Sequence, residues 1–415
     1  MVLSCLSWIP ITCKQLVAPF IPRRPCEPLP DDIVIDILSR LPVECVLQCR
    51  RVCKQWKALT STPYFVEIHL KRATPTVIIH LVHHKDIEQF FIDEWGDSIK
   101  KMKTRIQKIC TAPILAENKY LNPLLNFSYD GLLIFRPKFI DTQGASIIFN
   151  PITQEKVTLH NCWGEICGIF FHPLAREYRV IWLGTRSSSV KFKILSLGAQ
   201  SSWRQLPDFS YMPRIGVPPV ILNEALHWMV EIYYAQDATT HFPPCPQSIV
   251  IFDIRKEEFH VMPHPGDHEG SICEIKHNQM HLLEIEGRLS LCEFSLCAQV
   301  IDIWILEDYA KWFWIRRHTI SLELDLKRYP FSYDFRQNCL VRVLGILNGE
   351  LLLHWKDRGL FAYHLQHGTV RKFERKFEKS GMDGLFTHAY MSLHSKSLVS
   401  LRNFKSEIFM EPINY

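Results

Sequence analysis

The feature that most constrains the fold of this chain is a turn that recurs along it, each time followed by a short apolar run. The turn opens the segments 129–132, 176–179, 223–226, 286–289 and 348–351. A second unit, in which a polar turn joins two apolar runs, alternates with the first around Asn150-Pro151, Gly198, Asp253 and Gly368. A period near 40–50 residues with about four strands per unit is typical of a β-propeller. The chain therefore has room for roughly six to eight blades.

From residue 76 onward the apolar runs have strand length and are separated by turn residues. We expect strands at 76–82, 132–135, 146–149, 166–171, 178–183, 190–195, 220–222, 226–230, 249–254, 281–285, 289–294, 300–306, 312–315, 340–344, 351–355 and 360–365. Helices do not alternate with these runs, which disfavours a doubly wound α/β fold. The basic stretch 98–110 is expected to be a surface helix or a long loop, and 300–320 to hold a hairpin inserted into the repeat.

Residues 28–70 have a helical pattern instead. Asp31 and Asp32 follow Leu29-Pro30, where an aspartate can cap a helix and complement its dipole. Apolar residues then recur at helical spacing, at Ile33, Ile37 and Leu41 with Val34 and Leu38 beside them. We expect Arg40 in the last turn of this helix and Pro42 in the first turn of the next. The second apolar stripe ends before Pro63.

A segment this short buries too little apolar surface to be stable alone by a wide margin. Its apolar residues also lie on more than one side of the expected helices. Two interpretations follow: a small helical subdomain packed on the rest of the chain, or a helical module whose spare face is buried on a partner.

The helical stretch resembles the F-box family. The residues that carry the resemblance are Leu29-Pro30, Ile33, Ile37-Leu38, Leu41-Pro42, Arg51-Val52-Cys53, Trp56, Pro63 and Phe65. Cys45 departs from the pattern, because plant members often carry Ser or Asp there. The resemblance implies a three-helix module over residues 26–70. It also implies docking on a Skp-type adaptor, and through it on the cullin scaffold of an SCF ubiquitin ligase.

The residues that the resemblance assigns to adaptor binding are Leu29, Pro30, Ile33, Ile37, Leu38, Leu41, Pro42, Val46 and Val52. Trp56 and some of these nine residues could instead form the module's own core. The sequence does not separate the two roles.

The body of the chain, residues 71–415, resembles the plant F-box-associated domain. The matching phrases include Gly131-Leu132-Leu133, Asn150-Pro151-Ile152-Thr153, Leu226-His227-Trp228, Ile251-Phe252-Asp253 and Gly349-Glu350-Leu351. Gly-Gly pairs and Trp-Asp dipeptides are absent from the sequence, so the kelch and WD patterns do not apply. The expected fold is mainly β: a small N-terminal α module followed by a propeller-like repeat domain.

Composition limits the compartment and the partners. A net charge of only +5 over 415 residues gives no strong general attraction for nucleic acid or anionic membrane. The 14 cysteines are scattered, which is typical of reduced thiols in a cytoplasmic or nuclear protein. No apolar run is long enough to cross a bilayer. Residues 1–25 lack a basic start and are interrupted by Pro10 and Lys14, so we prefer a leader or disordered tail over a secretory signal.

Few residue groups suggest chemistry of their own. His264, His268, Cys273, His277 and His281 are zinc-ligand types, but no C-x-x-C pair anchors them, and we expect loop and surface histidines. Cys162 and Cys167 are either a redox pair or, as we prefer, neutral core thiols. Strand alternation puts Trp312 and Trp314 on one face, where we expect core packing between blades rather than a ligand-stacking platform. No catalytic motif or cofactor-binding motif is found.

The sequence therefore predicts a non-catalytic substrate receptor that binds an adaptor and an unknown target protein, with no cofactor, metal, nucleic acid or membrane. One alternative is a propeller enzyme with the F-box as a regulatory handle, which needs acids or a metal in the central channel. Another is a propeller that binds sugars or small molecules through exposed aromatic side chains.

Overall fold

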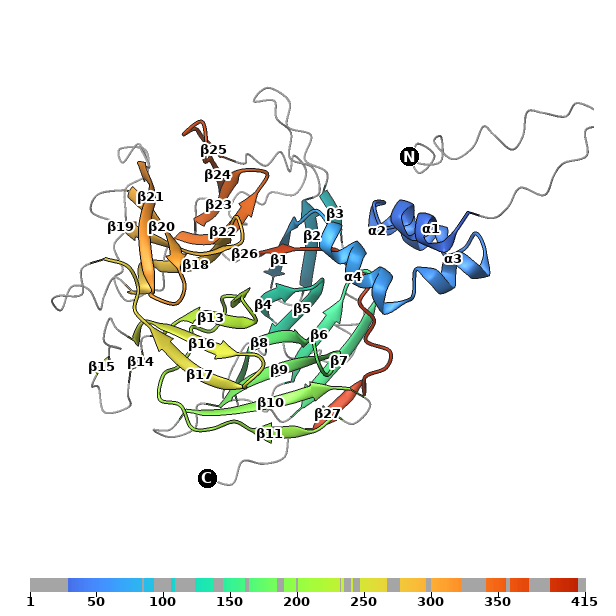
Figure 1. Ribbon diagram of the computed structural model, residues 1–415, viewed down its shortest axis with the longest axis horizontal. Coiled ribbons are helices and arrows are strands. Elements are labelled where there is room, and N and C mark those ends of the chain that lie inside the picture. Colours follow the sequence, from blue (N-terminus) through green and yellow to red (C-terminus); the bar gives the residue numbers. More distant parts are fainter. Residues whose placement is uncertain are drawn as a thin grey trace, which may run out of the picture. The chain divides into compact units, whose positions relative to one another are not determined.

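The fold is described on a computed structural model of the chain, drawn in Figure 1. The structure describes residues 29–83, 86–92, 106–108, 124–136, 145–160, 164–184, 190–198, 201–231, 233–234, 240–241, 247–266, 277–295, 300–321, 341–355, 359–372 and 389–409. The chain divides into two compact units. One is helical (Met1–Thr74 with Ser395–Val399), and the other is built of strands (Pro75–His394 with Ser400–Tyr415). Residues 1–25, the expected leader, lie outside the described residues.

The helical unit contains α1 (Asp31–Leu38), α2 (Val43–Cys49), α3 (Lys54–Leu59) and α4 (Pro63–Arg72). Side chains cap two of these helices. The Sγ of Cys53 accepts the N–H of Trp56 at 3.4 Å ahead of α3. The Oγ1 of Thr62 accepts the N–H of Phe65 at 3.2 Å ahead of α4. Each bond satisfies an N–H that the first turn of a helix leaves unpaired.

Several details of the helical prediction are corrected by the structure. Pro30 is the N-cap of α1, so Asp31 and Asp32 do not cap it; they lie in its first turn, where their charge favours the dipole. Arg40 lies beyond the end of α1, and Pro42 is the N-cap of α2 rather than a residue of its first turn. The predicted second stripe is divided between α2 and α3. The described part of the helical unit therefore holds four helices where a three-helix module was predicted.

The core of the helical unit is formed by residues from three helices: Val34, Leu38, Val43, Val46, Cys49 and Phe65. The separate segment Ser395–Val399 completes this unit. Within it, Leu398 and Val399 are buried, and the Nζ of Lys396 lies 2.7 Å from the Oε1 of Glu44 on α2. A stretch near the C-terminus therefore belongs structurally to a module near the N-terminus.

The second unit is a β-propeller of six blades, within the predicted range. Blade 1 consists of β26 (Ala389–His394), β1 (Thr76–His83), β2 (Asp86–Ile92) and β3 (Ile106–Lys108). Blade 2 consists of β4 (Leu124–Tyr129), β5 (Leu132–Arg136), β6 (Ser146–Asn150), β7 (Glu155–His160) and an added strand, β27 (Glu407–Phe409). Blade 3 consists of β8 (Glu165–His172), β9 (Glu177–Gly184), β10 (Lys191–Leu197) and β11 (Trp203–Gln205).

Blade 4 consists of β12 (Val220–Leu222), β13 (Ala225–Met229), β16 (Ile249–Asp253) and β17 (Glu258–Met262). The short pair β14 (Tyr233–Tyr234) and β15 (Thr240–His241) is inserted in it. Blade 5 consists of β18 (Met280–Ile285), β19 (Arg288–Ser295), β20 (Val300–Asp308) and β21 (Phe313–Ser321). Blade 6 consists of β22 (Val341–Leu347), β23 (Glu350–Trp355), β24 (Gly359–His364) and β25 (Val370–Lys372).

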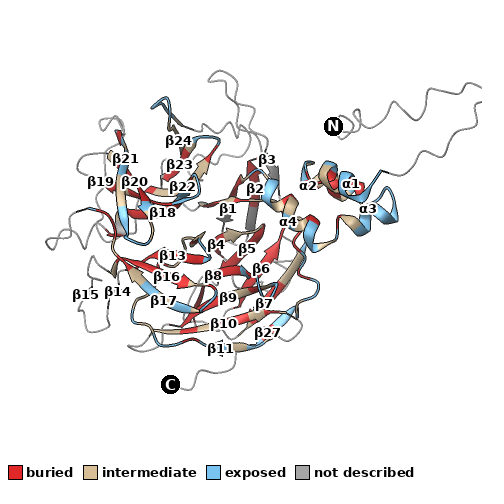
Figure 2. Ribbon diagram, in the orientation of Figure 1, coloured by how far each residue is buried: buried red, intermediate tan, exposed pale blue. Residues whose placement is uncertain are grey.

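Apolar residues from adjacent blades form shared clusters, which explains why the strands are buried on both faces (Figure 2). Leu283 of blade 5, for example, packs in one cluster with Leu351 of blade 6. Val77 of blade 1 packs with Leu352 of blade 6, so the last blade meets the first. A blade alone would leave both apolar faces in water, and its neighbours cover them.

The two repeated turns found in the sequence are confirmed as the two hairpin turns of a blade. The first turn joins the innermost strand to the second, and the residues in it have positive φ, as at Asp130-Gly131 and Asn348-Gly349. The second turn joins the third strand to the fourth, as between β6 and β7. Because successive strands of a blade are antiparallel, both turns lie on one face of the propeller. We call this the hairpin face.

Three local predictions fail in informative ways. The stretch 98–110 contains a strand, β3, in its described part, because β2 offers it an open edge to pair with. The pair within 300–320 is no insertion but the two outer strands of blade 5. Trp312 lies in the turn between them, so it does not share a strand face with Trp314. Strand β26 carries no repeat of its own and was not predicted.

Candidate functional site

The helical unit exposes apolar side chains in a way that its own core does not require. Leu29, Ile33, Ile37 and Val52 are 56%, 46%, 49% and 66% exposed. Ile33 and Ile37 are one helical turn apart on α1, so they lie on the same side of that helix. Their neighbours Val34 and Leu38 are buried on its other side. α1 therefore has two apolar faces, of which the unit uses one.

The nine residues predicted to bind an adaptor are divided by the structure. Leu29, Pro30, Ile33, Ile37, Pro42 and Val52 are exposed, and Leu41 is half-buried. Leu38 and Val46 are buried in the core of the helical unit, at 1% and 0% exposure, so in this structure they have no surface to offer a partner. Trp56, which could instead belong to the module's own core, is half-buried. The adaptor role of the exposed residues stays a prediction.

Charged groups fix the end of α1 beside this apolar surface. The carboxylate of Asp36 lies 3.1 Å from the guanidinium of Arg40 and 2.9 Å from that of Arg72 on α4. These two hydrogen-bonded guanidinium groups hold the pKa of Asp36 below its ordinary value. At the start of α1, the Nε2 of Gln55 on α3 donates to the Oδ1 of Asp31 at 2.7 Å. The sequence pattern did not predict these links between helices.

Two buried polar contacts fix the connections between the helices. The Nε2 of His69 donates to the carbonyl of Leu41 at 3.0 Å, and burial lowers the pKa of His69. The guanidinium of Arg50 donates to the carbonyl of Thr60 at 2.7 Å. Both contacts hold a turn between two helices. They therefore help to position the helices that carry the exposed apolar side chains.

In the propeller, polar side chains gather where the innermost strands begin. Glu165 on β8 is buried and pairs with Arg136 at 3.2 Å. Burial raises the pKa of Glu165, although Arg136 opposes this. Arg214, between blades 3 and 4, donates to the carbonyls of Met280 and His277 at 2.6 and 2.5 Å. These contacts connect elements of different blades.

Two more basic groups lie at the same end of the innermost strands. Arg342 on β22 donates to the carbonyl of Gly216 at 2.6 Å, and burial lowers the pKa of Arg342 to about 10. Burial, together with the charges of Arg214 and Arg342, lowers the pKa of His281 to about 3. His281 is therefore neutral at physiological pH. These groups hold the segment 213–216 against blades 5 and 6, which is a structural role.

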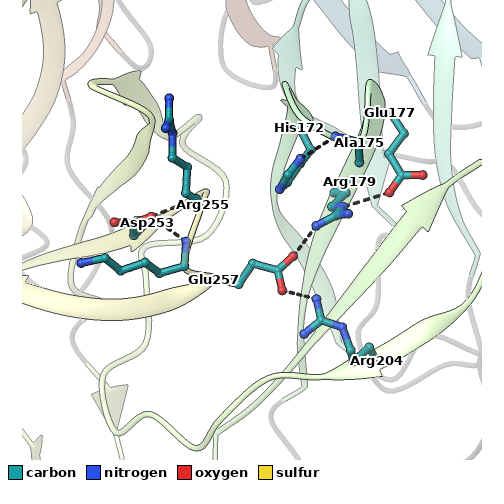
Figure 3. A network of polar contacts seen from close by, with 9 residues as sticks. His172, Ala175, Glu177, Arg179, Arg204, Asp253, Arg255 and Glu257 are labelled. Atoms are coloured by element: carbon teal, nitrogen blue, oxygen red, sulfur yellow. Dashed lines mark hydrogen bonds and ion pairs between the residues drawn. The ribbon is translucent and has the colours of Figure 1, made fainter.

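Figure 3 shows a polar network that joins blades 3 and 4 on the hairpin face. The guanidinium of Arg179 on β9 contacts the carboxylates of Glu177 and Glu257. Arg204 on β11 contacts the other oxygen of Glu257, which belongs to the β16–β17 turn of blade 4. The carboxylate of Glu257 thus pairs with two arginines of the neighbouring blade, which connects the two blades.

Two of the candidate metal ligands meet in the structure, because the rings of His264 and His277 lie edge to face with centroids 4.9 Å apart. The expectation of surface histidines was wrong for His264, His277 and His281, which are buried, while His268 and Cys273 lie outside the described residues. No cluster of three or more potential ligands is found among the described residues. Cys167 is buried, burial raises its pKa, and its Sγ donates to the carbonyl of Ile181, while Cys162 lies outside the described residues.

Residues 78–394 match the family described as "F-box associated beta propeller domain". The chain belongs to this family. Residues 27–67 match a second family, described as "F-box-like". Both resemblances inferred from the sequence motifs are therefore confirmed, and the boundary between the two matches lies close to the boundary between the two structural units.

Two relatives from Arabidopsis thaliana align with this chain over most of their length. The chain is 25% identical to "F-box protein At3g07870" over 384 residues, which cover 83% of this chain and 87% of the relative. It is 25% identical to "F-box protein DOR" over 373 residues, which cover 84% and 88%. The solved structure entitled "Structure of YjhT" is 10% identical, covers 61% of this chain and 84% of its own, and has a TM-score of 0.37.

The chain is thus a plant-type F-box protein with a propeller, and this combination supports a role in substrate recognition in general. Among the described residues, none of the helices has the length and apolar character that crossing a membrane requires.

Proposed function

We propose that this chain is the substrate-recognition subunit of an SCF-type ubiquitin ligase in the cytoplasm, the nucleus or both. The helical unit docks on a Skp-type adaptor, which connects it to a cullin scaffold, and the propeller binds the target protein. The chain supplies no catalytic group of its own. It raises the effective concentration of the target beside the partner enzymes.

The observation that carries this proposal is the second apolar face of α1. Ile33 and Ile37 remain about half exposed while Val34 and Leu38 complete the core. Leu29 and Val52 extend the exposed apolar surface beyond α1. An exposed apolar stripe on a small helical module marks a protein interaction site.

Co-expression with a Skp-type adaptor tests the proposal. Ile33→Asp with Ile37→Asp places two charges on the exposed face, where they leave the core of the helical unit unchanged. Burying each isoleucine contributes about 1.5–3 kcal/mol, so we expect the double variant to bind the adaptor at least about 100-fold more weakly. Affinity is measured by calorimetry on the purified chains.

Leu174→Asp is the matched control, because Leu174 is an exposed apolar residue of the propeller. Circular dichroism verifies that all variants are folded. Adaptor binding that survives the double substitution would rule out the proposed docking face.

A further inference from the structure

The second turns of blades 2, 4, 5 and 6 share one local structure. In each turn, the side chain of the last residue of the third strand accepts hydrogen bonds from the main-chain N–H groups two and three positions later. These last residues are Asn150, Asp253, Asp308 and His364. This side-chain cap fixes a tight turn. The residue at the fourth position after the cap then has positive φ.

Blade 5 breaks the residue pattern at that fourth position. The equivalent residues in the other three turns are Gln154, Glu257 and Gly368, with φ of 60°, 57° and 66°. In blade 5 the residue is Trp312, with φ of 53°. Polar residues and glycine tolerate this left-handed conformation, whereas a bulky aromatic residue in it is an outlier. Among the described non-glycine residues with positive φ, Trp312 is the one aromatic residue.

Packing does not explain the choice of tryptophan. Trp312 is 45% exposed and the next residue, Phe313, is 57% exposed. Tyr309 in the turn and Trp314 on β21 make the core contacts here, because both pack on the cluster between blades 4 and 5. Two aromatic side chains therefore stand in water on the hairpin face, one of them on a strained backbone. Strain without a packing benefit is typical of a functional position.

The same turn forms one wall of a pocket between blades 4 and 5. The pocket has a volume of about 210 Å³ and is lined by Leu222, Asn223, Gly287, Arg288, Leu289, Leu306, Glu307 and Tyr309. Three leucines and the tyrosine ring form the apolar part of its wall, beside the polar side chains of Asn223, Arg288 and Glu307.

Three polar side chains of the pocket, those of Tyr309, Arg288 and Glu307, already have partners. His227 donates through Nδ1 to the carbonyl of Val220 at 3.0 Å, so its neutral ring accepts the hydroxyl of Tyr309 at Nε2, 2.7 Å away. Arg288 and Glu307 form an ion pair at 2.5 Å. The pocket is therefore close to neutral.

The size and chemistry of the pocket determine what fits it. Its volume is below the range of about 300–1,000 Å³ that is usual for small-molecule sites, and suits a single large side chain. A sugar would need free donors and acceptors, while the Tyr309 hydroxyl and the Arg288–Glu307 pair already have partners. A second copy of the chain would need roughly 800 Å² per partner, far more than two aromatic side chains and one pocket provide.

We propose that the hairpin face of blade 5 is the docking site for a peptide segment of the target protein. A bulky apolar side chain of the peptide enters the pocket, and Trp312 and Phe313 cover the adjoining uncharged residues. The inference rests on the proposed role as a substrate receptor, and adds the face, the residues and the peptide chemistry.

The test uses the full chain bound to its Skp-type adaptor and a phage-displayed library of random peptides as the probe. We expect enriched peptides to share a Trp, Phe or Leu flanked by uncharged residues. A fluorescein-labelled enriched peptide should bind Trp312→Asn and Phe313→Ser at least about tenfold more weakly than wild type, which is a loss of ~1.4 kcal/mol. Asparagine tolerates positive φ, so Trp312→Asn is expected to fold and to melt no lower than wild type.

Leu174→Ser is the matched control, because Leu174 is exposed in the first turn of blade 3 on the same face. Its peptide affinity should equal that of wild type. Absence of an enriched peptide, or equal affinity of Trp312→Asn and wild type, would overturn the proposal. The proposal would also be overturned if the wild-type chain bound a glycan array, or self-associated in sedimentation, and Trp312→Asn did not.

Adaptor affinity is measured in the same samples. Retained adaptor binding without peptide binding rejects the docking site alone, whereas loss of adaptor binding in wild type rejects the proposed function.

Discussion

Asp130 is a carboxyl group enclosed by two tyrosines in the first turn of blade 2. The hydroxyl of Tyr178 donates to its Oδ2 at 3.2 Å, and the rings of Tyr129 and Tyr178 meet edge to face. Burial raises the pKa of Asp130 to about 6, against the hydrogen bonds of the two hydroxyl groups, which lower it. At neutral pH the carboxylate of Asp130 is therefore charged, although its surroundings favour the protonated, neutral carboxyl group.

Asp130→Asn should consequently stabilise the propeller at neutral pH. From the ordinary pKa of 3.8 up to about 6, the folded chain keeps a proton that the unfolded chain releases, so stability falls as pH rises through this window. Asparagine avoids this loss, can accept the Tyr178 hydroxyl and tolerates the φ of 49°. We expect a higher Tm near pH 7.5, by roughly 2–4 °C for each kcal/mol regained, and no difference near pH 4.

Calorimetry at the two pH values measures this difference. Asp208→Asn serves as the control, because Asp208 is exposed and pairs with Lys191 at the surface. A Tm difference that does not change between the two pH values would show that the burial of Asp130 is not its cause.

Single residues also mark where prediction from sequence stops. Helical spacing placed both Ile33 and Val34 in an apolar pattern. It did not predict that Val34 lies in the core and Ile33 in solvent, because both sides of α1 are apolar. Alternation placed Trp312 in a strand, because it cannot detect the Asp308 cap that starts the turn. Both failures concern tertiary environment, which a local pattern does not contain.

At the scale of elements, Ser395–Val399 has neither helix nor strand and still belongs to the helical unit. The apolar side chains of Leu398 and Val399 are buried there. A helical unit of this size buries limited apolar surface by itself. We infer that the segment contributes to its stability, which no motif in the sequence indicates.

Leu398→Ala with Val399→Ala should destabilise the helical unit and leave the propeller intact. Removing a buried leucine side chain costs about 2–5 kcal/mol, so we expect faster hydrogen exchange of the amides in α1 and α2. Adaptor binding should weaken although no exposed apolar residue of α1 has changed. Exchange is followed by mass spectrometry on the full chain.

Lys396→Ala is the control for this variant. It removes the pair with the partly exposed Glu44, and such pairs contribute about 0–1 kcal/mol. Unchanged exchange in α1 and α2 of the double variant would mean that the segment lies on the unit without supporting it.

Elements with strong local signals were predictable. The paired turns were found because positive φ selects Gly, Asn and Asp, as at Gly131 and Asn348, and because Asn150 and Asp253 cap the second turns. Strands β26 and β27 were missed for the opposite reason. Each pairs with a strand far away in sequence, and its own residues carry no repeat.

At the scale of the whole molecule, the propeller closes by combining the two ends of its chain. Blade 1 takes β1, β2 and β3 from the start of the propeller and its innermost strand, β26, from the end. Thr76 pairs with His394 and Leu81 with Ala389, so the full length of β26 is hydrogen-bonded to β1. The repeat in the sequence predicted a propeller, but closure depends on these distant pairings.

Deleting residues 389–415 should therefore open the ring, whereas deleting 400–415 should not. The longer deletion removes Met391 from the cluster between blades 1 and 6 and leaves β1 with an unpaired edge. Loss of one such buried side chain costs about 2–5 kcal/mol, before the lost strand pairing is added. We expect the longer deletion to lose cooperative thermal unfolding and to aggregate.

The shorter deletion removes β27, which pairs with only the edge of blade 2, and should retain a single cooperative transition in circular dichroism. A cooperative transition in both deletions would show that blades 1 and 6 hold together through their side chains alone.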